Sequence, residues 1–381
     1  MKLELIATST FGLEAVVRRE IEGLGYKVIK TEDGRVTFMG DERAVIRSNL
    51  WLRTADRVYI KMAEFKAETF EELFQQIKAV SWEEYIPING KFTVVGTSVK
   101  SKLHSVPSCQ SITKKAVVSR LSDFYCIDTL PETGAEHKIR FAIMKDRVTV
   151  MLDTSGDGLH KRGYRVVDVA APMKETLAAA LVQLSFYRAD KQLIDPCCGS
   201  GTILIEAAMI GRNIAPGLGR DFAAAHWDFI PEEMWKEERK IAYNAADFDS
   251  ELKIKGYDID RRAIAAAEKN ADEAGVQDDI EFFRMDMQKF TPEGEYGVII
   301  VNPPYGERIG EKAEIEKIYA KLAKVLSENP TWSLFMITTD KDIEEKHFGR
   351  NADRRRKLYN GRLETQFYQF HGKRPEKAKI D

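Results

Sequence analysis

The feature that most constrains the fold of this chain is a regular alternation, in its second half, of short apolar segments with helical ones. The alternation extends from Gln192 to Thr338, and glycine-rich turns separate its segments. This pattern is typical of βαβ units on a parallel sheet, so we predict an α/β fold for this half. The expected strands and helices are Gln192–Asp195, Thr202–Ile210, Lys253–Asp258, Arg261–Ala274, Ile280–Arg284, Gly297–Val301, Ile315–Leu326 and Trp332–Thr338.

A hairpin is predicted after this alternation. Its strands are expected near Lys357–Leu358 and over Leu363–Phe370, and the Asn-Gly pair within Tyr359–Arg362 is a strong signal for a tight turn. We place this antiparallel pair at the edge of the sheet. The basic run Arg354–Lys357, just before the first strand, has two interpretations: contact with nucleic acid, or protection of an edge strand against aggregation.

The first half of the chain has a different pattern, and the length of 381 residues favours two or three domains. Residues from Leu3 to Met39 are predicted to form a small α+β unit. A second α/β module, with a helix over Phe70–Val80 and a strand over Lys91–Thr97, continues to about Thr154. Hydrophobic residues make up 44% and charged residues 31% of the chain, which is ordinary globular composition.

The formal net charge of −2 argues against a protein that binds nucleic acid over its whole surface, but the charge is unevenly distributed. The segment from Gly96 to Ser122 contains basic side chains and no acidic one. Basic and hydroxyl residues alternate there with small ones, which suits phosphate contact on a helix face; the alternative is a solvated basic helix. The basic residues are Lys100, Lys102, Lys114, Lys115 and Arg120.

Targeting and metal signals are both lacking. No N-terminal stretch resembles a signal peptide, and no apolar run approaches the roughly 20 residues of a membrane span, so we expect a soluble, cytoplasmic protein without membrane contact. The cysteines have neither metal-ligand nor disulfide-framework spacing, so no metal site is predicted. They are Cys109, Cys126, Cys197 and Cys198.

A candidate cofactor site begins where the apolar strand ending at Asp195 meets the turn that contains Gly199 and Gly201. Glycines let the backbone approach a ligand closely, and a carboxylate at the strand end can accept hydrogen bonds from the ammonium group of an aminoacyl tail. The next strand ends in Asp258, which can bind the hydroxyls of a ribose. Asp286 follows a third strand and can accept from an adenine amino group. A capped turn and solvated acids are the alternative interpretation of each feature taken alone.

The turn after the strand Gly297–Val301 is the candidate catalytic motif, Asn302-Pro303-Pro304-Tyr305. Two prolines make the turn rigid. The Asn302 side-chain oxygen and the Pro303 carbonyl can accept the protons of an exocyclic base amine and aim its nitrogen at a methyl group, while Tyr305 stacks on the extruded base. A sulfonium methyl donor has a good leaving group, so positioning supplies most of the catalysis and no strong base is needed.

The segment Asp195–Thr202, taken together with Asn302–Tyr305, resembles the class I amino-methyltransferases. His160–Arg165 followed by Ala171–Ala178 resembles the segment before the catalytic domain of THUMP-domain RNA methyltransferases. The similarity is greatest to the bacterial 23S rRNA guanine-N2 methyltransferase family, which the insertion from Arg220 to Asn244 and the longer motif Asn302–Arg308 also resemble.

The resemblance covers nearly the whole chain and implies three parts: a ferredoxin-like segment over 1–65, a THUMP RNA-binding domain over 66–155, and a Rossmann-like methyltransferase domain over 156–381. It implies S-adenosylmethionine as cofactor, with Lys174 and Thr176 in its pocket. It also implies RNA as partner, namely large-subunit rRNA or an assembly intermediate, with guanine N2 as the methylated atom.

Several alternatives share the same motif. An adenine-N6 methyltransferase acting on RNA or DNA would use the same turn, because the motif serves any planar exocyclic amine. A protein glutamine methyltransferase would present an amide to it, and a non-enzymatic RNA chaperone could keep the fold. No groove-reading DNA-binding motif is found in the first half, which favours RNA. The oligomeric state and the modified nucleotide stay open.

Overall fold

The computed structural model describes residues 1–167, 173–305 and 311–373. The chain divides into two compact units. The N-terminal unit comprises Met1–Ser9, Val17–Leu159 and Arg220–Ala242, and the C-terminal unit comprises Thr10–Val16, His160–Gly219 and Tyr243–Asp381. The insertion that begins at Arg220, which we predicted within the last domain, thus packs with the N-terminal unit. The boundaries predicted at residues 65/66 and 155/156 stay predictions.

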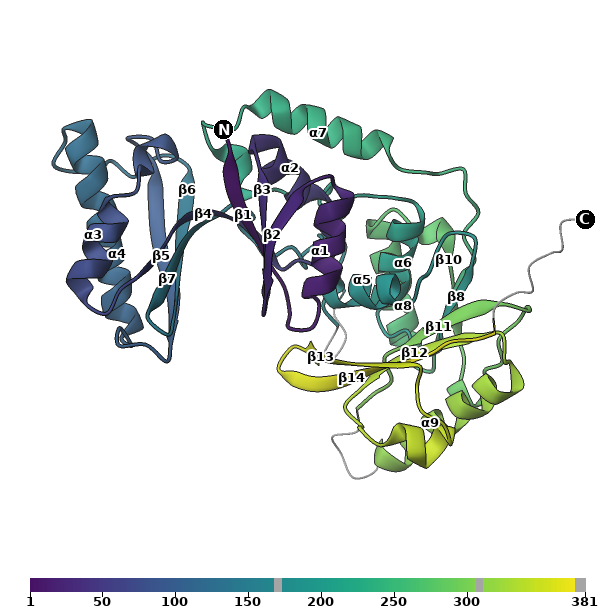
Figure 1. The fold of residues 1–381 in the computed structure, drawn as a ribbon. Coiled ribbons are helices and arrows are strands. Elements are labelled where there is room, and N and C mark those ends of the chain that lie inside the picture. The colour runs from purple at the N-terminus through teal and green to yellow at the C-terminus, as the bar shows by residue number, and fades with distance from the viewer. Residues whose placement is uncertain (168–172, 306–310, 374–381) are drawn as a thin grey trace, which may run out of the picture. The chain divides into compact units, whose positions relative to one another are not determined.

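One seven-stranded sheet runs through the N-terminal unit (Figure 1). Neighbouring strands are antiparallel except β5 and β6, which are parallel. The first two predicted modules share this sheet, because β4 pairs with β1 through Arg57–Ile60 and with β7 through Tyr59–Lys66. In spatial order the strands are β2 (Lys27–Glu32), β3 (Arg35–Gly40), β1 (Leu3–Thr8), β4 (Arg57–Lys66), β7 (Arg147–Asp153), β6 (Glu136–Met144) and β5 (Lys91–Val99).

Helices α3 and α4 pack against each other on the β5 side of this sheet (Figure 1). Helix α3 begins with a capping box, in which the Thr69 hydroxyl accepts from the Glu72 amide and the Glu72 carboxylate accepts from the Thr69 amide. Leu73 and Ile77 form its buried face. The helical elements that complete the first 159 residues are α1 (Glu14–Gly23), α2 (Glu42–Trp51), α3 (Phe70–Lys78), η1 (Trp82–Glu84) and α4 (Val106–Tyr125).

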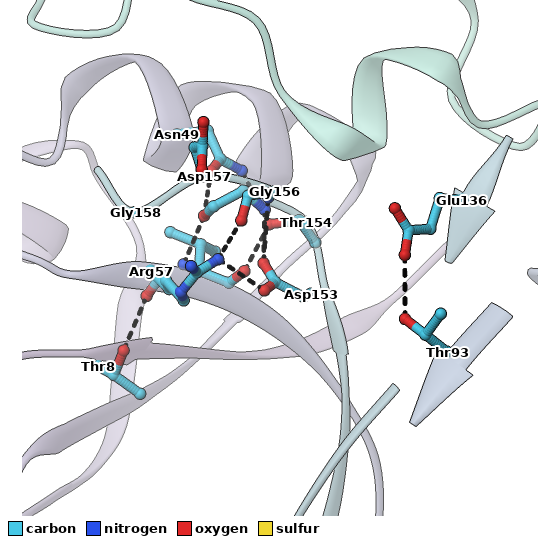
Figure 2. A network of polar contacts seen from close by, with 12 residues as sticks. Thr8, Asn49, Arg57, Thr93, Glu136, Asp153, Thr154, Gly156, Asp157 and Gly158 are labelled. Carbon is cyan, nitrogen blue, oxygen red and sulfur yellow. Dashed lines mark hydrogen bonds and ion pairs between the residues drawn. The ribbon is translucent and has the colours of Figure 1, made fainter. Parts of the chain in front are cut away.

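A polar network holds the chain where it leaves β7 (Figure 2). The Arg57 guanidinium donates to Asp153 Oδ2 at 2.8 Å and also to the Gly156 carbonyl. The other oxygen of Asp153, Oδ1, accepts from the amides of Ser155 at 3.0 Å and Gly156 at 3.2 Å. The buried carboxylate of Asp153 therefore has both a counter-ion and backbone donors within the chain.

Asn49 of α2 extends this network (Figure 2). Its amide nitrogen donates to Thr154 Oγ1 at 2.9 Å, and its carbonyl oxygen accepts from Ser155 Oγ at 2.7 Å. The backbone of Thr154 also binds the insertion, because the Thr154 carbonyl accepts a hydrogen bond from the Ala224 amide at 3.0 Å. The insertion is thereby joined to the end of β7.

The rest of the insertion, with η2 (Ala223–His226) and α7 (Glu232–Asn244), is held by charge and aromatic stacking. Glu238 of α7 accepts from Arg43 at 2.7 Å and from Arg47 at 2.8 Å, both on α2. Trp227 stacks on the buried His137 of β6, with ring centroids 4.9 Å apart and an interplanar angle of 13°. Aromatic pairs of this kind add to apolar burial, so the insertion is part of the N-terminal unit's core.

The C-terminal unit contains a second seven-stranded sheet (Figure 1). The first five strands in spatial order are parallel, and the last two form the antiparallel edge, which confirms the predicted α/β fold. In spatial order the strands are β10 (Ile280–Arg284), β9 (Ile254–Asp258), β8 (Gln192–Asp195), β11 (Gly297–Val301), β12 (Ser333–Thr338), β14 (Leu363–Phe370) and β13 (Arg354–Asn360).

Helices cover both faces of this sheet (Figure 1). Strand β11 is apolar on both faces. Val298 and Ile300 belong to the hydrophobic cluster that includes residues of α5, α6 and α8. Ile299 and Val301 belong to the cluster that includes residues of α9. A central parallel strand buried on both faces needs such a continuous apolar run. The helical elements are α5 (Glu175–Leu184), α6 (Thr202–Gly211), α8 (Arg261–Glu273), η3 (Gln277–Asp279), η4 (Met287–Lys289), α9 (Glu311–Glu328) and η5 (Glu344–Phe348).

The terminal hairpin is confirmed, with two corrections. The basic run that begins at Arg354 does not precede the edge strand but forms its first half, because β13 already starts there. The loop is also shifted by one residue. Asn360 still pairs with Leu363, so only Gly361 and Arg362 form the turn, and Gly361 takes the left-handed φ of +62° that the turn requires.

Candidate functional site

Four adjacent parallel strands of the C-terminal unit, β10, β9, β8 and β11, end at one edge of the sheet, and each end carries a predicted site residue. Asp195 ends β8, Asp258 ends β9, and Asp286 lies two residues after β10. Asn302 directly follows β11, the neighbour of β8 on its other side. The sheet thus brings the predicted cofactor acids and the predicted catalytic turn to the carboxyl ends of neighbouring strands, where ligands bind in open α/β sheets.

The glycine turn between β8 and α6 is shaped by two left-handed residues, Gly199 at φ +54° and Gly201 at φ +79°. Gly201 caps α6, and a Cβ there would lie 3.0 Å from the Cβ of Ala267 on α8. The Gly199 amide donates to Asp258 Oδ2 at 2.9 Å. Asp258 therefore fixes the turn as well as marking the end of β9, a role that the sequence did not predict.

Asp195 is the most unusual ionisable group of the site. It is 1% exposed, and its oxygen Oδ1 accepts from the Cys197 amide at 3.0 Å. Burial, together with the nearby charge of Asp258, raises the pKa of Asp195 to about 8. A desolvated carboxylate of this kind is stabilised by a cation. The ammonium group of an aminoacyl ligand would supply one, so the site fits the predicted S-adenosylmethionine.

The other predicted cofactor residues differ in their exposure. Asp286 caps the short turn η4, accepting from the Gln288 amide at 2.9 Å, and is partly exposed. Lys174 is exposed and caps α5 through its backbone, and Thr176 in the first turn of that helix is buried. The preceding residues, Ala171 and Pro172 of the quoted motif, lie outside the described part of the chain.

Arg165 joins two parts of the cofactor site and was not predicted as a site residue. Its guanidinium donates to Glu175 Oε1 at 2.9 Å and to the Met173 carbonyl at 2.8 Å, both at the start of α5. It also donates to Ser200 Oγ at 3.3 Å and Thr202 Oγ1 at 3.2 Å, in the glycine turn. One planar group thus ties α5 to the turn, which requires arginine geometry.

The chain around Arg165 is anchored by buried polar contacts. On its N-terminal side, Arg162 Nε and the Tyr164 hydroxyl both donate to Glu206 Oε1 of α6, at 3.3 and 3.1 Å. On its C-terminal side, the Val166 amide donates to the Asn270 side-chain oxygen at 3.1 Å. This segment, which in sequence only resembled the stretch before the catalytic domain, therefore supports the candidate cofactor site.

The candidate catalytic motif is held by a hydrogen bond between two of its own side chains and by one from the hairpin. The Tyr305 hydroxyl donates to Asn302 Oδ1 at 2.7 Å and accepts from Asn360 Nδ2 at 3.1 Å. Burial raises the pKa of Tyr305, so the hydroxyl stays protonated and able to donate. Pro303 is buried and Pro304 exposed. Gly306–Arg308 of the longer motif lie outside the described residues.

The predicted RNA-binding residues lie in the N-terminal unit, but they do not share one helix face. Lys100 and Lys102 lie in the loop after β5, and only Lys114, Lys115 and Arg120 belong to α4. Our expectation of one basic helix face was therefore wrong. The segment lacks acids in sequence, yet acids from other elements reach its cations.

The acids come from outside the basic segment. Glu68, just before α3, pairs with Lys102, and Glu83 in η1 pairs with Arg120. Glu132 lies 3.4 Å from Lys114. These pairs could not be inferred from the local sequence, because the partners are 18 or more residues away. The two remaining lysines, Lys100 and Lys115, are exposed, and Lys115 lies over the Phe74 ring.

Two further properties bear on the site. Among the residues that the structure describes, no cluster of histidine, cysteine, aspartate or glutamate could hold a metal ion. Within the same residues, no helix is both long and apolar enough to cross a membrane.

Comparison with known families now identifies the class. A parallel sheet with acids at successive strand ends and an Asn-Pro-Pro-Tyr turn defines a methyltransferase that takes its methyl group from S-adenosylmethionine. The chain belongs to the family of UPF0020, RMKL-like methyltransferase domains, whose model matches residues 162–369. The RlmL ferredoxin-like domain matches residues 4–59 and the THUMP domain residues 67–153, which confirms the resemblance seen in the sequence.

Two curated relatives support this assignment. The chain is 49% identical over 383 residues to a putative RNA methyltransferase, YpsC, of Bacillus subtilis, covering 100% of this chain and 99% of that protein. It is 35% identical over 384 residues to the ribosomal RNA large subunit methyltransferase K/L of Syntrophotalea carbinolica, covering 97% of this chain. The chain spans 53% of the length of that second protein.

Solved structures show the same fold. SMU.472, described as a putative methyltransferase complexed with SAH, is 46% identical with a TM-score of 0.93 and covers 98% of this chain and 99% of its own. A protein of Listeria monocytogenes, described as a predicted N6-adenine-specific DNA methylase, is 48% identical with a TM-score of 0.93, covering 98% and 97%. TrmN of Thermus thermophilus, at 17% identity and a TM-score of 0.71, shows the fold alone.

Proposed function

We propose that this protein methylates the exocyclic amine of a base in RNA, namely guanine N2 in large-subunit rRNA. The observation that carries the proposal is the position of Asn302: it follows β11, beside the end of β8, where Asp195 lies buried. An acceptor for an amine thus lies next to the residue expected to hold the cofactor's cationic tail. The names of the two curated relatives support RNA, and the second supports large-subunit rRNA.

Each strand end has a separate part in cofactor binding. Asp195 holds the ammonium group, Asp258 the ribose hydroxyls and Asp286 the adenine amine, with Lys174 and Thr176 at the pocket's side. Gly199 and Gly201 let the backbone come close to the ligand. The bound cofactor would supply a methyl group from its sulfonium, because the neutral thioether that remains, S-adenosylhomocysteine, is a good leaving group.

The residues after β11 act on the base. The Asn302 side-chain oxygen and the Pro303 carbonyl accept hydrogen bonds from the amine, which fixes its nitrogen for in-line attack on the methyl carbon. The Tyr305 ring stacks on the base once it is extruded. As the new N–C bond forms, the methyl–sulfur bond breaks and the amine becomes acidic, so its proton passes to water without a strong base.

RNA engagement is assigned to the N-terminal unit. Lys100, Lys102, Lys114, Lys115 and Arg120 contact phosphates there, which fixes position without reading bases. We expect Lys100 and Lys115 to contribute most, because the structure shows no carboxylate partner for either of them among the described residues. The three others already neutralise acids, so a phosphate must compete for them.

Adenine N6 is the second candidate, in RNA or DNA, because the Asn302 turn accepts either amine. The description of the Listeria protein as a predicted N6-adenine-specific DNA methylase favours testing it. In both candidate functions the methylated group is the exocyclic amine of a base.

The test is to incubate the protein and its Asn302→Ala variant with methyl-labelled S-adenosylmethionine and RNA from cells that lack the protein, followed by nucleoside digestion and chromatography. We expect label in N2-methylguanosine of large-subunit rRNA with the wild type only. Label in N6-methyladenosine would show that the methylated base is adenine and not guanine. Label in duplex DNA but not in RNA would refute the proposal, as would undiminished transfer by Asn302→Ala.

A further inference from the structure

The end of the terminal hairpin reaches the catalytic motif, although nothing in the hairpin belongs to that motif. Asn360 is the last residue of β13, and its amide nitrogen donates to the Tyr305 hydroxyl at 3.1 Å. That hydroxyl donates in turn to Asn302 Oδ1 at 2.7 Å. A chain of two hydrogen bonds therefore joins the sheet edge to the residue that we expect to bind the substrate amine.

The position of Asn360 is fixed by the packing of its strand. Leu358 is fully buried, and Tyr359 makes an edge contact with Phe11 at 6.2 Å between ring centroids. Gly12 lies so close that a Cβ there would be 2.7 Å from the Lys357 carbonyl oxygen. The Asn360 side chain is thus presented from a well-packed element and not from a free loop tip.

The direction of the two hydrogen bonds matters. A tyrosine hydroxyl has a single proton, and an amide NH2 group only donates. Because Asn360 donates to the hydroxyl, the hydroxyl proton is directed to Asn302, whose carboxamide is then held with its oxygen toward the site. A carbonyl oxygen has two lone pairs, so one stays available for the substrate amine.

The opposite orientation would be unproductive. The two ends of a carboxamide have nearly the same shape, and without a fixed partner the group can rotate to present its NH2 end. The NH2 group of Asn302 would then face the substrate amine, and because both groups are donors no hydrogen bond would form between them. The part of Tyr305 that prevents this is its hydroxyl, which leaves its ring free for the base.

We propose that Asn360 is a positioning residue of the methyl transfer, which acts through the Tyr305 hydroxyl to keep the Asn302 oxygen turned toward the substrate amine. The inference rests on the proposed role of Asn302 and extends it to the sheet edge. Asn360 itself touches neither the substrate nor the cofactor.

The decisive variant is Asn360→Asp. Aspartate has the same shape and is as well tolerated as asparagine beside a tight turn, so a purely structural role would leave activity near that of the wild type. Its carboxylate, however, accepts where the amide donated. The Tyr305 hydroxyl then donates its hydrogen bond to this carboxylate, and the Asn302 side-chain oxygen loses its donor.

The experiment measures single-turnover methyl transfer to RNA, the KM for RNA and the affinity for S-adenosylhomocysteine. We expect Asn360→Asp and Asn360→Ala each to lower the transfer rate by roughly tenfold, about the worth of one well-placed hydrogen bond. KM and cofactor affinity should stay within about twofold of wild type. The matched control is Asn329→Ala, which removes an asparagine whose Nδ2 bonds to the Val325 carbonyl at the end of α9; its transfer rate should not change.

A double-mutant cycle tests the route through Tyr305. If Asn360 acts through the hydroxyl, Asn360→Ala in a Tyr305→Phe background should slow transfer no further. Wild-type rates in both Asn360 variants, or losses that multiply with that of Tyr305→Phe, would overturn the inference while leaving the proposed function intact. Failure of the wild type to methylate any RNA would instead refute the proposed function.

Discussion

Two buried aspartates at the ends of strands, one in each unit, show how differently the same side chain can be used. Asp153 ends β7 and is 2% exposed, and Asp195 ends β8 and is 1% exposed. Asp153 has the guanidinium of Arg57 at 2.8 Å and two backbone donors (Figure 2). Asp195 has the Cys197 amide, and the charge that acts on it is that of another acid, Asp258.

The difference supports the proposal that Asp153 has a structural role and that Asp195 binds a ligand. Burial raises the pKa of Asp153 too, but the charge of Arg57 opposes the rise. For Asp195 the neighbouring charge acts in the same direction as burial. A buried acid with no cation beside it among the described residues costs folding free energy, and a function that supplies the cation explains why it is there.

The largest loss of stability from a single substitution is expected when the internal ion pair is broken. Asp153→Asn leaves Arg57 without its counter-ion, so the free energy of unfolding should fall by about 3–5 kcal/mol, as for other broken buried pairs. Urea unfolding followed by circular dichroism measures this. The control Asp190→Asn, which removes an exposed partner of Arg188, should change stability by less than about 0.5 kcal/mol. An equal loss of unfolding free energy in both variants would contradict a special structural role for the Asp153–Arg57 pair.

The next effect is a pH dependence that comes from Asp195. Its pKa is near 3.9 in an unfolded chain and about 8 when folded, so the folded state binds the proton more tightly. Stability without cofactor should therefore be highest below about pH 4 as far as this group is concerned, and it should fall by about 1.4 kcal/mol per pH unit up to about pH 8.

The measurement compares urea unfolding of the wild type and of Asp195→Asn between pH 5 and pH 9. Asparagine does not ionise, so the variant should gain stability over the wild type as the pH rises, and the gain should level off above about pH 8. Parallel pH profiles would show that Asp195 is already ionised with a partner that the structure does not reveal.

The smallest effect concerns the group that supports the Asp195 site. Arg165→Lys keeps the charge but loses the planar donor set that joins Met173 and Glu175 to the glycine turn. We expect S-adenosylhomocysteine to bind more weakly by about 1 kcal/mol, or roughly fivefold, in calorimetric titration. The control Arg188→Lys, at an exposed pair, should bind normally. A normal affinity of Arg165→Lys for S-adenosylhomocysteine would show that Arg165 contributes to folding and not to cofactor binding.

The strand-end residues could be predicted from sequence because a local pattern specifies them. Apolar runs that end in Asp195 and Asp258, with glycine after the first, require only that parallel strands lie side by side. The same holds for Asn302 after β11. Local pattern and tertiary structure agree at these positions, and the alternating strands and helices of the second half were predicted from the same local pattern.

Long-range partners could not be predicted in the same way. Asn360 was interpreted as a turn residue because Asn-Gly is a local turn signal, and its contact with Tyr305 joins residues 55 positions apart. Arg165 was not predicted as a site residue, because its partners Ser200 and Thr202 lie 35 and 37 positions away in the chain. The segment around Lys102 and Arg120 was interpreted as a free basic face because Glu68 and Glu83 lie outside it.

Calorimetric titration with S-adenosylhomocysteine tests whether Asp195 binds the cationic tail of the cofactor. We expect Asp195→Asn to bind roughly ten- to a hundredfold more weakly than the wild type at pH 8, as for a lost charge-assisted hydrogen bond, while Asp153→Asn binds normally if it is folded. Unchanged binding by Asp195→Asn, with weakened binding by folded Asp153→Asn, would refute this role of Asp195.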